Sequence, residues 1–183
     1  MIVYQPFPAR GLEWVQPAST GDFDRVYGIL GQELRDRWVP PVMTFLCEDD
    51  QGIELGRAEA PWLAENALVF RSGSLDSARR VLGSSGEFLP MAVDGSEDVE
   101  LWAFNALRII DAFDYGRARV VRFSSGRVMT VDSFAFKEDQ VAKEIAFRVP
   151  GLRQVFVTDL GVDALLRYEI SGLRFDPVWK TYS

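Results

Sequence analysis

The stretch FLPMAVDGSEDVELWAFNALRIIDAFD, residues 88–114, decides the fold of this chain. It opens with an apolar run over residues 88–93, continues through an acidic segment over residues 94–100 and returns to an apolar run over residues 101–105. Short apolar runs separated by polar turn residues are typical of strands that are buried in a sheet. We therefore expect two core strands joined by an acidic loop, with Trp102 among the buried side chains.

Further strand signals lie on both sides of this stretch. Residues 118–123 and 128–136 are separated by the sequence Ser-Ser-Gly-Arg, which predicts a hairpin. Residues 1–14 contain Pro6 and Pro8, which lack a backbone N–H, so we expect at best an edge strand there. Other apolar runs predict strands over residues 42–47, 68–70, 145–149, 154–157 and 173–178.

Two helices have clear start and stop residues, and each is expected to bury an apolar face. The first runs from Ser74 to Gly83, and the second follows Thr158 and ends before Gly172. The residues expected to be buried are Leu75, Ala78, Val81 and Leu82 in the first helix, and Leu160, Leu165, Leu166 and Ile170 in the second.

Weaker helical spacing follows Gly21, where one or two short helices are expected, and a helical turn is expected within residues 137–144. Strands outnumber helices, and several are linked as hairpins. These features predict an α+β fold with a mainly antiparallel sheet and a few short helices. A length of 183 residues favours a single domain over residues 1–183, with the less regular part in residues 1–67.

The charges are unevenly distributed along the chain. Residues 1–100 carry 17 acidic and 8 basic side chains, and residues 101–183 carry 10 acidic and 12 basic ones. Proteins that bind nucleic acids normally have a basic excess, so the net charge of −7 argues against DNA or RNA as a partner. The acidic first half is suited to steering a basic protein partner, although the same charges also keep a surface soluble.

Composition also bears on the compartment. The sequence has no run of about 18 apolar residues, so we expect no membrane span. Its first residues lack the basic and apolar regions of a signal peptide. The single cysteine, Cys47, excludes an internal disulfide, and its apolar surroundings predict a buried thiol. Together these observations favour a cytoplasmic protein.

The chain contains no histidine. This removes the most common general base near neutral pH, the catalytic arrangements that depend on it and most zinc sites. No phosphate-binding or nucleophile-elbow motif is present, and the acidic segments lack the alternate spacing of a calcium loop. We therefore expect no catalytic residues, no metal and no cofactor.

A group of arginines follows the central stretch, namely Arg108, Arg117, Arg119, Arg122 and Arg127. These side chains are suited to contacting an anion or an acidic partner. Alternatively, they pair with the acidic first half or cover apolar surface with their aliphatic stems.

Six short motifs follow one another along the chain: EFLPM at 87–91, LWAFN at 101–105, IDAFD at 110–114, AFRV at 146–149, VFVTD at 155–159 and ISGLRFDPVW at 170–179. In this order they resemble a bacterial immunity-protein family of polymorphic toxin systems. The resemblance is strongest over residues 68–179. It implies a protein that neutralises a toxin delivered between competing bacteria and whose gene lies beside the toxin gene.

Immunity by binding requires no catalytic group, but it does require a complementary surface with a few aromatic or arginine anchors. From the acidic first half and the tryptophan before Pro40, we predict that the toxin-binding residues are Trp38, Glu48, Asp49, Asp50, Asp94, Glu97 and Asp98. An acidic surface of this kind predicts a basic toxin. Two alternatives stay open: a small-molecule-binding module or histidine-free enzyme, and a structural protein that forms homo-oligomers.

Overall fold

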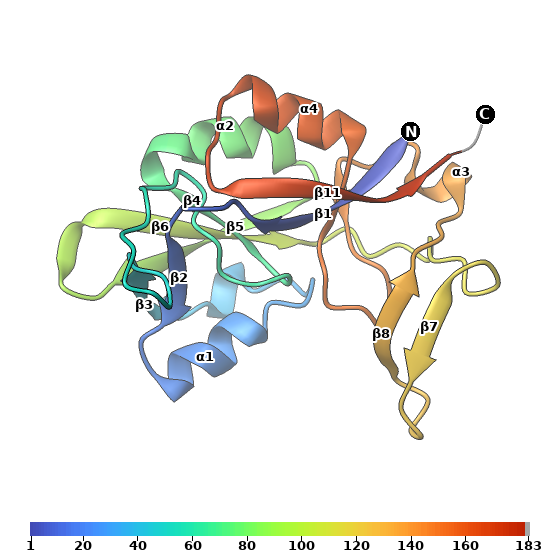
Figure 1. Cartoon of the computed structure of the whole chain (residues 1–183), viewed down its shortest axis with the longest axis horizontal. Coiled ribbons are helices and arrows are strands. Elements are labelled where there is room, and N and C mark those ends of the chain that lie inside the picture. The colour runs from blue at the N-terminus through green and yellow to red at the C-terminus, as the bar shows by residue number, and fades with distance from the viewer. Residues whose placement is uncertain (182–183) are drawn as a thin grey trace.

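The structure, a computed structural model, describes residues 1–181, and for residues 96–100 it describes the backbone but not the side chains. These residues form four α-helices, one short 3-10 helix and eleven strands (Figure 1). The helices are α1 (Thr20–Tyr27), η1 (Arg35–Arg37), α2 (Ser72–Leu82), α3 (Glu138–Val141) and α4 (Asp159–Arg167). The strands are β1 (Ile2–Pro8), β2 (Trp14–Pro17), β3 (Val42–Leu46), β4 (Leu68–Arg71), β5 (Gly86–Val93), β6 (Ser96–Ala106), β7 (Arg119–Arg122), β8 (Val128–Ser133), β9 (Ala146–Phe147), β10 (Phe156–Thr158) and β11 (Leu173–Lys180).

The strands make three sheets. A four-stranded sheet has the order β11-β1-β10-β9, a five-stranded sheet has the order β2-β3-β5-β6-β4, and β7 and β8 pair with each other. Every named strand pair is antiparallel except β3 with β5, which is parallel. The prediction of an α+β fold with mainly antiparallel pairing and short helices is therefore confirmed.

The helices cover opposite sides of these sheets. Figure 1 shows α2 and α4 side by side along one side and α1 on the other. One apolar cluster fills the space between the sheets and α2 with α4, and includes Phe70, Phe104 and Leu82. A second cluster lies on the α1 side of the five-stranded sheet and includes Val26 and Met43.

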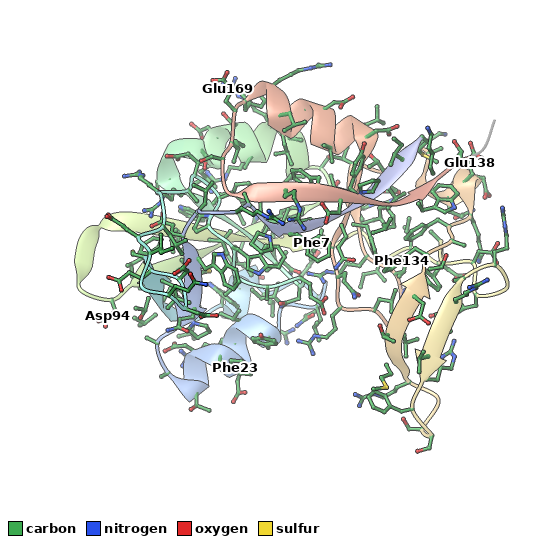
Figure 2. The ribbon with its side chains drawn as sticks, viewed as in Figure 1. Phe7, Phe23, Asp94, Phe134, Glu138 and Glu169 are labelled. Atoms are coloured by element: carbon green, nitrogen blue, oxygen red, sulfur yellow. The ribbon has the colours of Figure 1, made fainter. Side chains whose placement is uncertain are left out.

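A third apolar cluster is aromatic and lies beside the four-stranded sheet. Phe136 makes edge-on contacts with Phe113, Phe147 and Phe156 at ring-centroid distances of 5.2–5.7 Å. Phe134 stacks on Phe136 at 6.2 Å, and Figure 2 shows it at the base of the projecting hairpin. We call β7, β8 and the turn between them the arm; its base is thus fixed to a packed core.

The central stretch forms the expected pair of strands, but the expected acidic loop over residues 94–100 is wrong. β5 and β6 pair from Gly86 with Ala106 outward, and the turn occupies only Asp94 and Gly95. Gly95 has φ +69°, a left-handed conformation that only glycine adopts without strain, so the chain reverses in two residues. The strand therefore resumes at Ser96.

The first residues form an inner strand and not an edge strand. β1 lies between β10 and β11, and Val3 is fully buried. β10 pairs with β1 only at Val3 and Tyr4, so Pro6 and Pro8 lie where β11 is the only named neighbour. A proline is tolerated there because one side of the strand needs no ladder hydrogen bond.

Three burial expectations are also wrong. Cys47 is exposed, because β3 ends at Leu46 and the chain turns to the surface. Trp102 is only partly buried. In α4, Leu160 and Leu166 are exposed, and the buried face carries Gly161, Val162 and Leu165.

The reason for the rotation of α4 is a close approach at Gly161. A Cβ at this position would lie 2.6 Å from the Val157 side chain and 2.8 Å from the Ile145 carbonyl oxygen. The helix therefore meets the sheet through the face that carries the glycine. Thr158 occupies the N-cap position as expected, but its hydroxyl donates to the Glu144 carbonyl oxygen instead of capping the helix.

The predicted start of α2 is three residues late, because the N-cap position belongs to Arg71 and not to Ser74. The helix begins at Ser72, and the Ser74 hydroxyl donates to the carbonyl oxygens of Arg71 and Glu59. The expected apolar face of this helix is buried. Among the described residues, no helix combines the length and the apolar character needed to cross a bilayer.

The guanidinium of Arg148 joins segments that are distant in sequence. Its Nε donates to the Ala106 carbonyl oxygen at 3.1 Å, and Nη1 donates to the Arg153 carbonyl oxygen at 2.6 Å. Its Nη2 donates to the carbonyl oxygens of Ile29 and Asn66. The side chain is 1% exposed, and it has no carboxylate partner among the described residues.

The surroundings of the Arg148 guanidinium disfavour its positive charge. Burial away from water, with a smaller contribution from the nearby Arg153 cation, lowers the pKa of the Arg148 guanidinium to about 10. The group stays protonated near neutral pH because that pKa is still well above 7. Four carbonyl dipoles therefore take the place of both water and a counter-ion.

We expect Arg148→Met to lower the free energy of unfolding by at least about 3 kcal/mol, because it leaves four buried carbonyl groups without their donor. The free energy of unfolding of Arg148→Lys should lie between those of the wild type and Arg148→Met, since an ammonium has three N–H donors but lacks the forked geometry of a guanidinium. Urea unfolding followed by tryptophan fluorescence measures both changes. Arg167→Met, at an exposed position, is the matched control. Equal midpoints for Arg148→Met and this control would contradict the assignment.

Candidate partner-binding site

Exposed acidic and apolar side chains gather on the loop that follows β3 and on the start of β2. We call this surface the acidic ledge; it consists of Trp14, Glu48, Asp49, Asp50, Ile53 and Glu54. These residues line a hollow of about 450 Å³. Trp14 is 42% exposed and Ile53 is 57% exposed, so two large apolar side chains lie among four carboxylates.

The loop of the ledge has a fixed local structure. The Asp49 carboxylate accepts hydrogen bonds from the backbone N–H groups of Gln51 and Ile53, both at 2.9 Å. Leu55 N–H donates to the Cys47 carbonyl oxygen at 2.7 Å and closes the base of the loop. Asp49 thus shapes the loop, as aspartates commonly do in turns, whereas Glu48 and Asp50 are directed at solvent.

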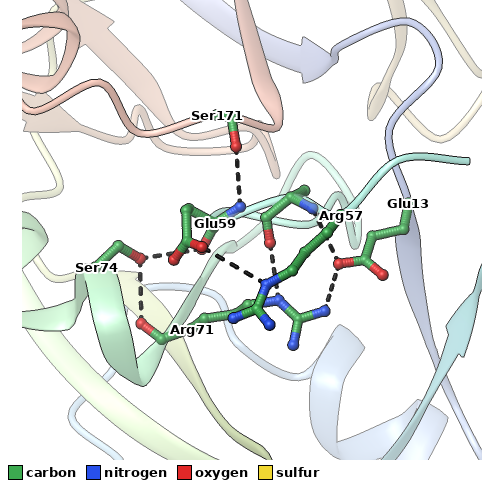
Figure 3. A network of polar contacts seen from close by, with 7 residues as sticks. Glu13, Arg57, Glu59, Arg71, Ser74 and Ser171 are labelled. Carbon is green, nitrogen blue, oxygen red and sulfur yellow. Dashed lines mark hydrogen bonds and ion pairs between the residues drawn. The ribbon is translucent and has the colours of Figure 1, made fainter.

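A buried ion pair involves Glu13, the residue before Trp14 of the ledge (Figure 3). Arg71 and Glu13 form a salt bridge in which each side chain is 7% exposed. The Glu13 carboxylate also accepts from the Ala58 N–H at 3.0 Å, and Arg71 Nε donates to the Ala58 carbonyl oxygen at 2.8 Å. The Arg71 guanidinium lies over the Phe45 ring, 4.2 Å from its centroid.

This pair connects the two strands that carry the ledge. Glu13 immediately precedes Trp14, and Phe45 is next to the last residue of β3. The neighbouring segment is held by Ser171, whose hydroxyl accepts from the Glu59 N–H at 3.1 Å. The segments that carry the ledge are therefore held by a buried ion pair and by backbone hydrogen bonds.

Trp38 lies in a different hollow from the ledge. Its indole N–H donates to the Pro90 carbonyl oxygen at 2.7 Å, so the ring is fixed in position. Arg35, Arg79 and Trp102 share this hollow, whose volume is about 630 Å³. The Arg79 guanidinium lies 4.9 Å from the Trp102 ring centroid. Arginines and tryptophans give this surface a different character from the ledge.

The other predicted partner-binding residues lie at the β5–β6 turn. Asp94 is exposed at the edge of the molecule in Figure 2, and its N–H donates to the Met43 carbonyl oxygen at 2.8 Å. The side chains of Glu97 and Asp98 lie outside the described residues. The structure therefore gathers Glu48, Asp49 and Asp50 and separates them from Trp38.

Sequence reasoning missed Trp14, Ile53 and Glu54 as parts of this surface. Trp14 precedes the buried Val15 in an extended segment, and this alternation was the available signal for an outward-facing tryptophan. Its closeness to the acidic loop depends on the pairing of Trp14 with Leu46, which links residues 32 positions apart. No local pattern carries that information.

The described residues include no group of three or more acidic or cysteine side chains placed to hold a metal ion. A carboxylate with a shifted pKa, Asp22, serves the fold. Its pKa is lowered by the hydrogen bond from the Ser19 hydroxyl, by the Val42 N–H and by Arg25. These contacts connect the start of α1 to β3.

Comparison with known protein families gives one finding and one negative result. The model of the immunity protein family Imm11 matches residues 87–180, which is just over half of the chain. The match runs from the second residue of β5 to the last residue of β11. No curated protein matches the sequence.

We expect Arg71→Met to lower the free energy of unfolding by about 3–5 kcal/mol, because it leaves the Glu13 charge buried without its partner. The double variant Arg71→Met with Glu13→Leu should lose less than the sum of the two single changes. Urea unfolding of the wild type, the two single variants and the double variant measures the coupling between Arg71 and Glu13. Arg57→Met, which breaks the exposed 3.7 Å pair with Glu59, should change little and serves as control. Simple additivity of the two buried changes would be evidence against coupling.

Proposed function

The chain belongs to the Imm11 immunity protein family, and on that basis we propose that it neutralises a cognate bacterial toxin by binding it, without catalysis. The observation that carries the proposal is the acidic ledge, where Trp14 and Ile53 are exposed among carboxylates on a rigid support. This combination suits a protein interface, in which a few aromatic anchors supply most of the affinity and charges supply orientation.

The charge of the ledge indicates the surface of the toxin that it recognises. Glu48, Asp50 and Glu54 have no ion pair among the described residues, so their charges are available to a partner. We propose that the toxin presents a basic surface here. Opposite charges accelerate encounter, and the advantage decreases as salt screens them.

We propose that the exposed apolar side chains of the ledge slow the dissociation of the complex. A half-exposed tryptophan that becomes covered removes a large apolar area from water without ordering a flexible chain. An interface of ordinary size covers about 800 Å² and roughly 20–30 residues on each partner, which is more residues than the ledge contains. We propose that Asp94 and the neighbouring Glu97 and Asp98 belong to the rim of the same interface.

We further propose that the chain acts in the cytoplasm as one domain over residues 1–183. The exposed Cys47 thiol is compatible with a reducing compartment. Binding as the means of protection fits a sequence without histidine, since a surface that only has to block a toxin needs no general base.

The central experiment is co-expression with the toxin encoded by the neighbouring gene. We expect the wild-type chain to restore growth and to co-purify with the toxin. Trp14→Ala should weaken binding by about 30-fold, the effect expected for an aromatic anchor, mainly through faster dissociation. Leu160→Ala removes a similarly exposed apolar side chain from α4 and should bind normally. Growth rescue without a complex would contradict inhibition by binding.

Charge steering is tested separately with Glu48→Ser combined with Asp50→Ser. We expect the association rate at low salt to fall about tenfold and its salt dependence to flatten. Asp76→Ser with Asp163→Ser makes the same change in net charge on the exposed sides of α2 and α4. Association rates measured at two salt concentrations distinguish the two pairs. Identical behaviour of both double variants would rule out steering by the ledge.

A further inference from the structure

The arm is a second surface with features that are typical of a protein-binding site. It projects from one end of the molecule, whereas β3, which leads into the ledge, lies toward the other end (Figure 1). β7 and β8 have only each other as named strand partners. Two-stranded sheets alone are marginally stable in water, and unpaired strand edges are ready sites for a further strand.

The arm is anchored at its base and exposed toward its tip. Val120 and Val131 pack against the aromatic cluster, so the hairpin starts from a fixed position. Farther out, Val121 is 42% exposed, Phe123 46% and Met129 60%. Three exposed apolar side chains on a projecting hairpin are more than a solvated tip requires, and such patches mark interaction sites.

The arm also carries uncompensated positive charge. Arg119, Arg122 and Arg127 have no ion pair among the described residues, and neither has Arg117, which lies two residues before β7. Arg122 donates to the Gly126 carbonyl oxygen at 2.7 Å and lies 5.0 Å from the Tyr115 ring centroid, so its guanidinium is held in place. By contrast, Arg108 pairs with Glu144 at 2.7 Å.

A cleft of about 620 Å³ separates the arm from the body. Arg122, Arg127 and Val128 line its arm side. On the body side, Leu30 is 40% exposed and Ile109 is 48% exposed. None of the described residues that line this cleft carries a carboxylate. The cleft therefore offers apolar contact together with cationic groups, which is the opposite charge pattern to that of the ledge.

From these observations we propose that the arm and its cleft bind an extended acidic segment of the toxin. The segment adds to the free edge of the hairpin by backbone hydrogen bonds, places its apolar side chains in the cleft and directs its carboxylates to Arg122 and Arg127. The proposal rests on the proposed function, because it takes the toxin as the partner. It adds a second contact of opposite sign, which fixes the orientation of the toxin.

The test is a double charge reversal, Arg122→Glu with Arg127→Glu, assayed with the toxin encoded by the neighbouring gene. We expect affinity to fall by at least about tenfold and its salt dependence to decrease. Arg80→Glu with Arg167→Glu makes the same change in net charge at exposed positions of α2 and α4 and should leave affinity unchanged. Arg127→Glu alone keeps the test valid if Arg122→Glu disturbs the turn. Among the described residues, the Arg127 side chain makes no intramolecular hydrogen bond, whereas Arg122 makes one.

A photo-crosslinking phenylalanine analogue in place of Tyr115, which lines the cleft, gives an independent readout. We expect it to capture the toxin. Wild-type binding with no effect of arm reversal and no crosslink would overturn the proposal and leave the proposed function standing. Absence of wild-type binding would overturn both. Self-association of the wild-type chain in sedimentation, lost on arm reversal while toxin affinity persists, would identify a second copy as the occupant and overturn the toxin assignment.

Discussion

The buried guanidinium of Arg148 is the interaction on which the rest of the structure depends. Its four carbonyl acceptors belong to the segment after α1, the segment before β4, the end of β6 and the segment before β10. These segments come from both larger sheets and from the α1 side of the molecule. A salt bridge would join two groups, whereas one fork among four carbonyls fixes the positions of four chain segments at once. The cost of desolvating the cation is offset only when all four are in place, so the arrangement is cooperative.

A second buried guanidinium, that of Arg71, lies near the ledge, and it is paired with a carboxylate. Arg71 and Glu13 neutralise each other, and each also forms a hydrogen bond with the backbone of Ala58. The ledge above them is consequently stiff, and a stiff surface loses little conformational freedom when a partner binds. The arm differs in kind. The arm is fixed at its base, it is cationic, and its two strands pair with no other named strand. The binding mode proposed for it therefore requires the partner to supply a further strand. A toxin that engages both surfaces would be recognised by shape at one end and by added backbone pairing at the other.

Local patterns were sufficient for much of this fold, and their failures have physical causes. The β5–β6 pair and the arm were predictable because each is a hairpin whose apolar runs are adjacent in sequence. β1 was not, since its burial depends on strands more than 150 residues away and its prolines suggest an edge. The face of α4 was misassigned because Leu160 and Leu166 are apolar, although the true contact is marked by Gly161. The acidic half of the candidate site was visible in the sequence, but Trp14 joins it only through the pairing of β2 with β3.

The position of β1 has a consequence for synthesis. Ile2 pairs with Lys180, so β1 leaves the ribosome long before β11, the strand that completes its pairing. At ordinary translation rates the interval between them is roughly 10–35 s. During that time Val3 and its neighbours have no sheet to enter, while the β5–β6 hairpin is already available for local pairing. The four-stranded sheet therefore closes only after β11 has been made, in a step that brings together distant contacts and is slow for that reason. A chain whose β11 is still to be synthesised thus lacks the complete four-stranded sheet.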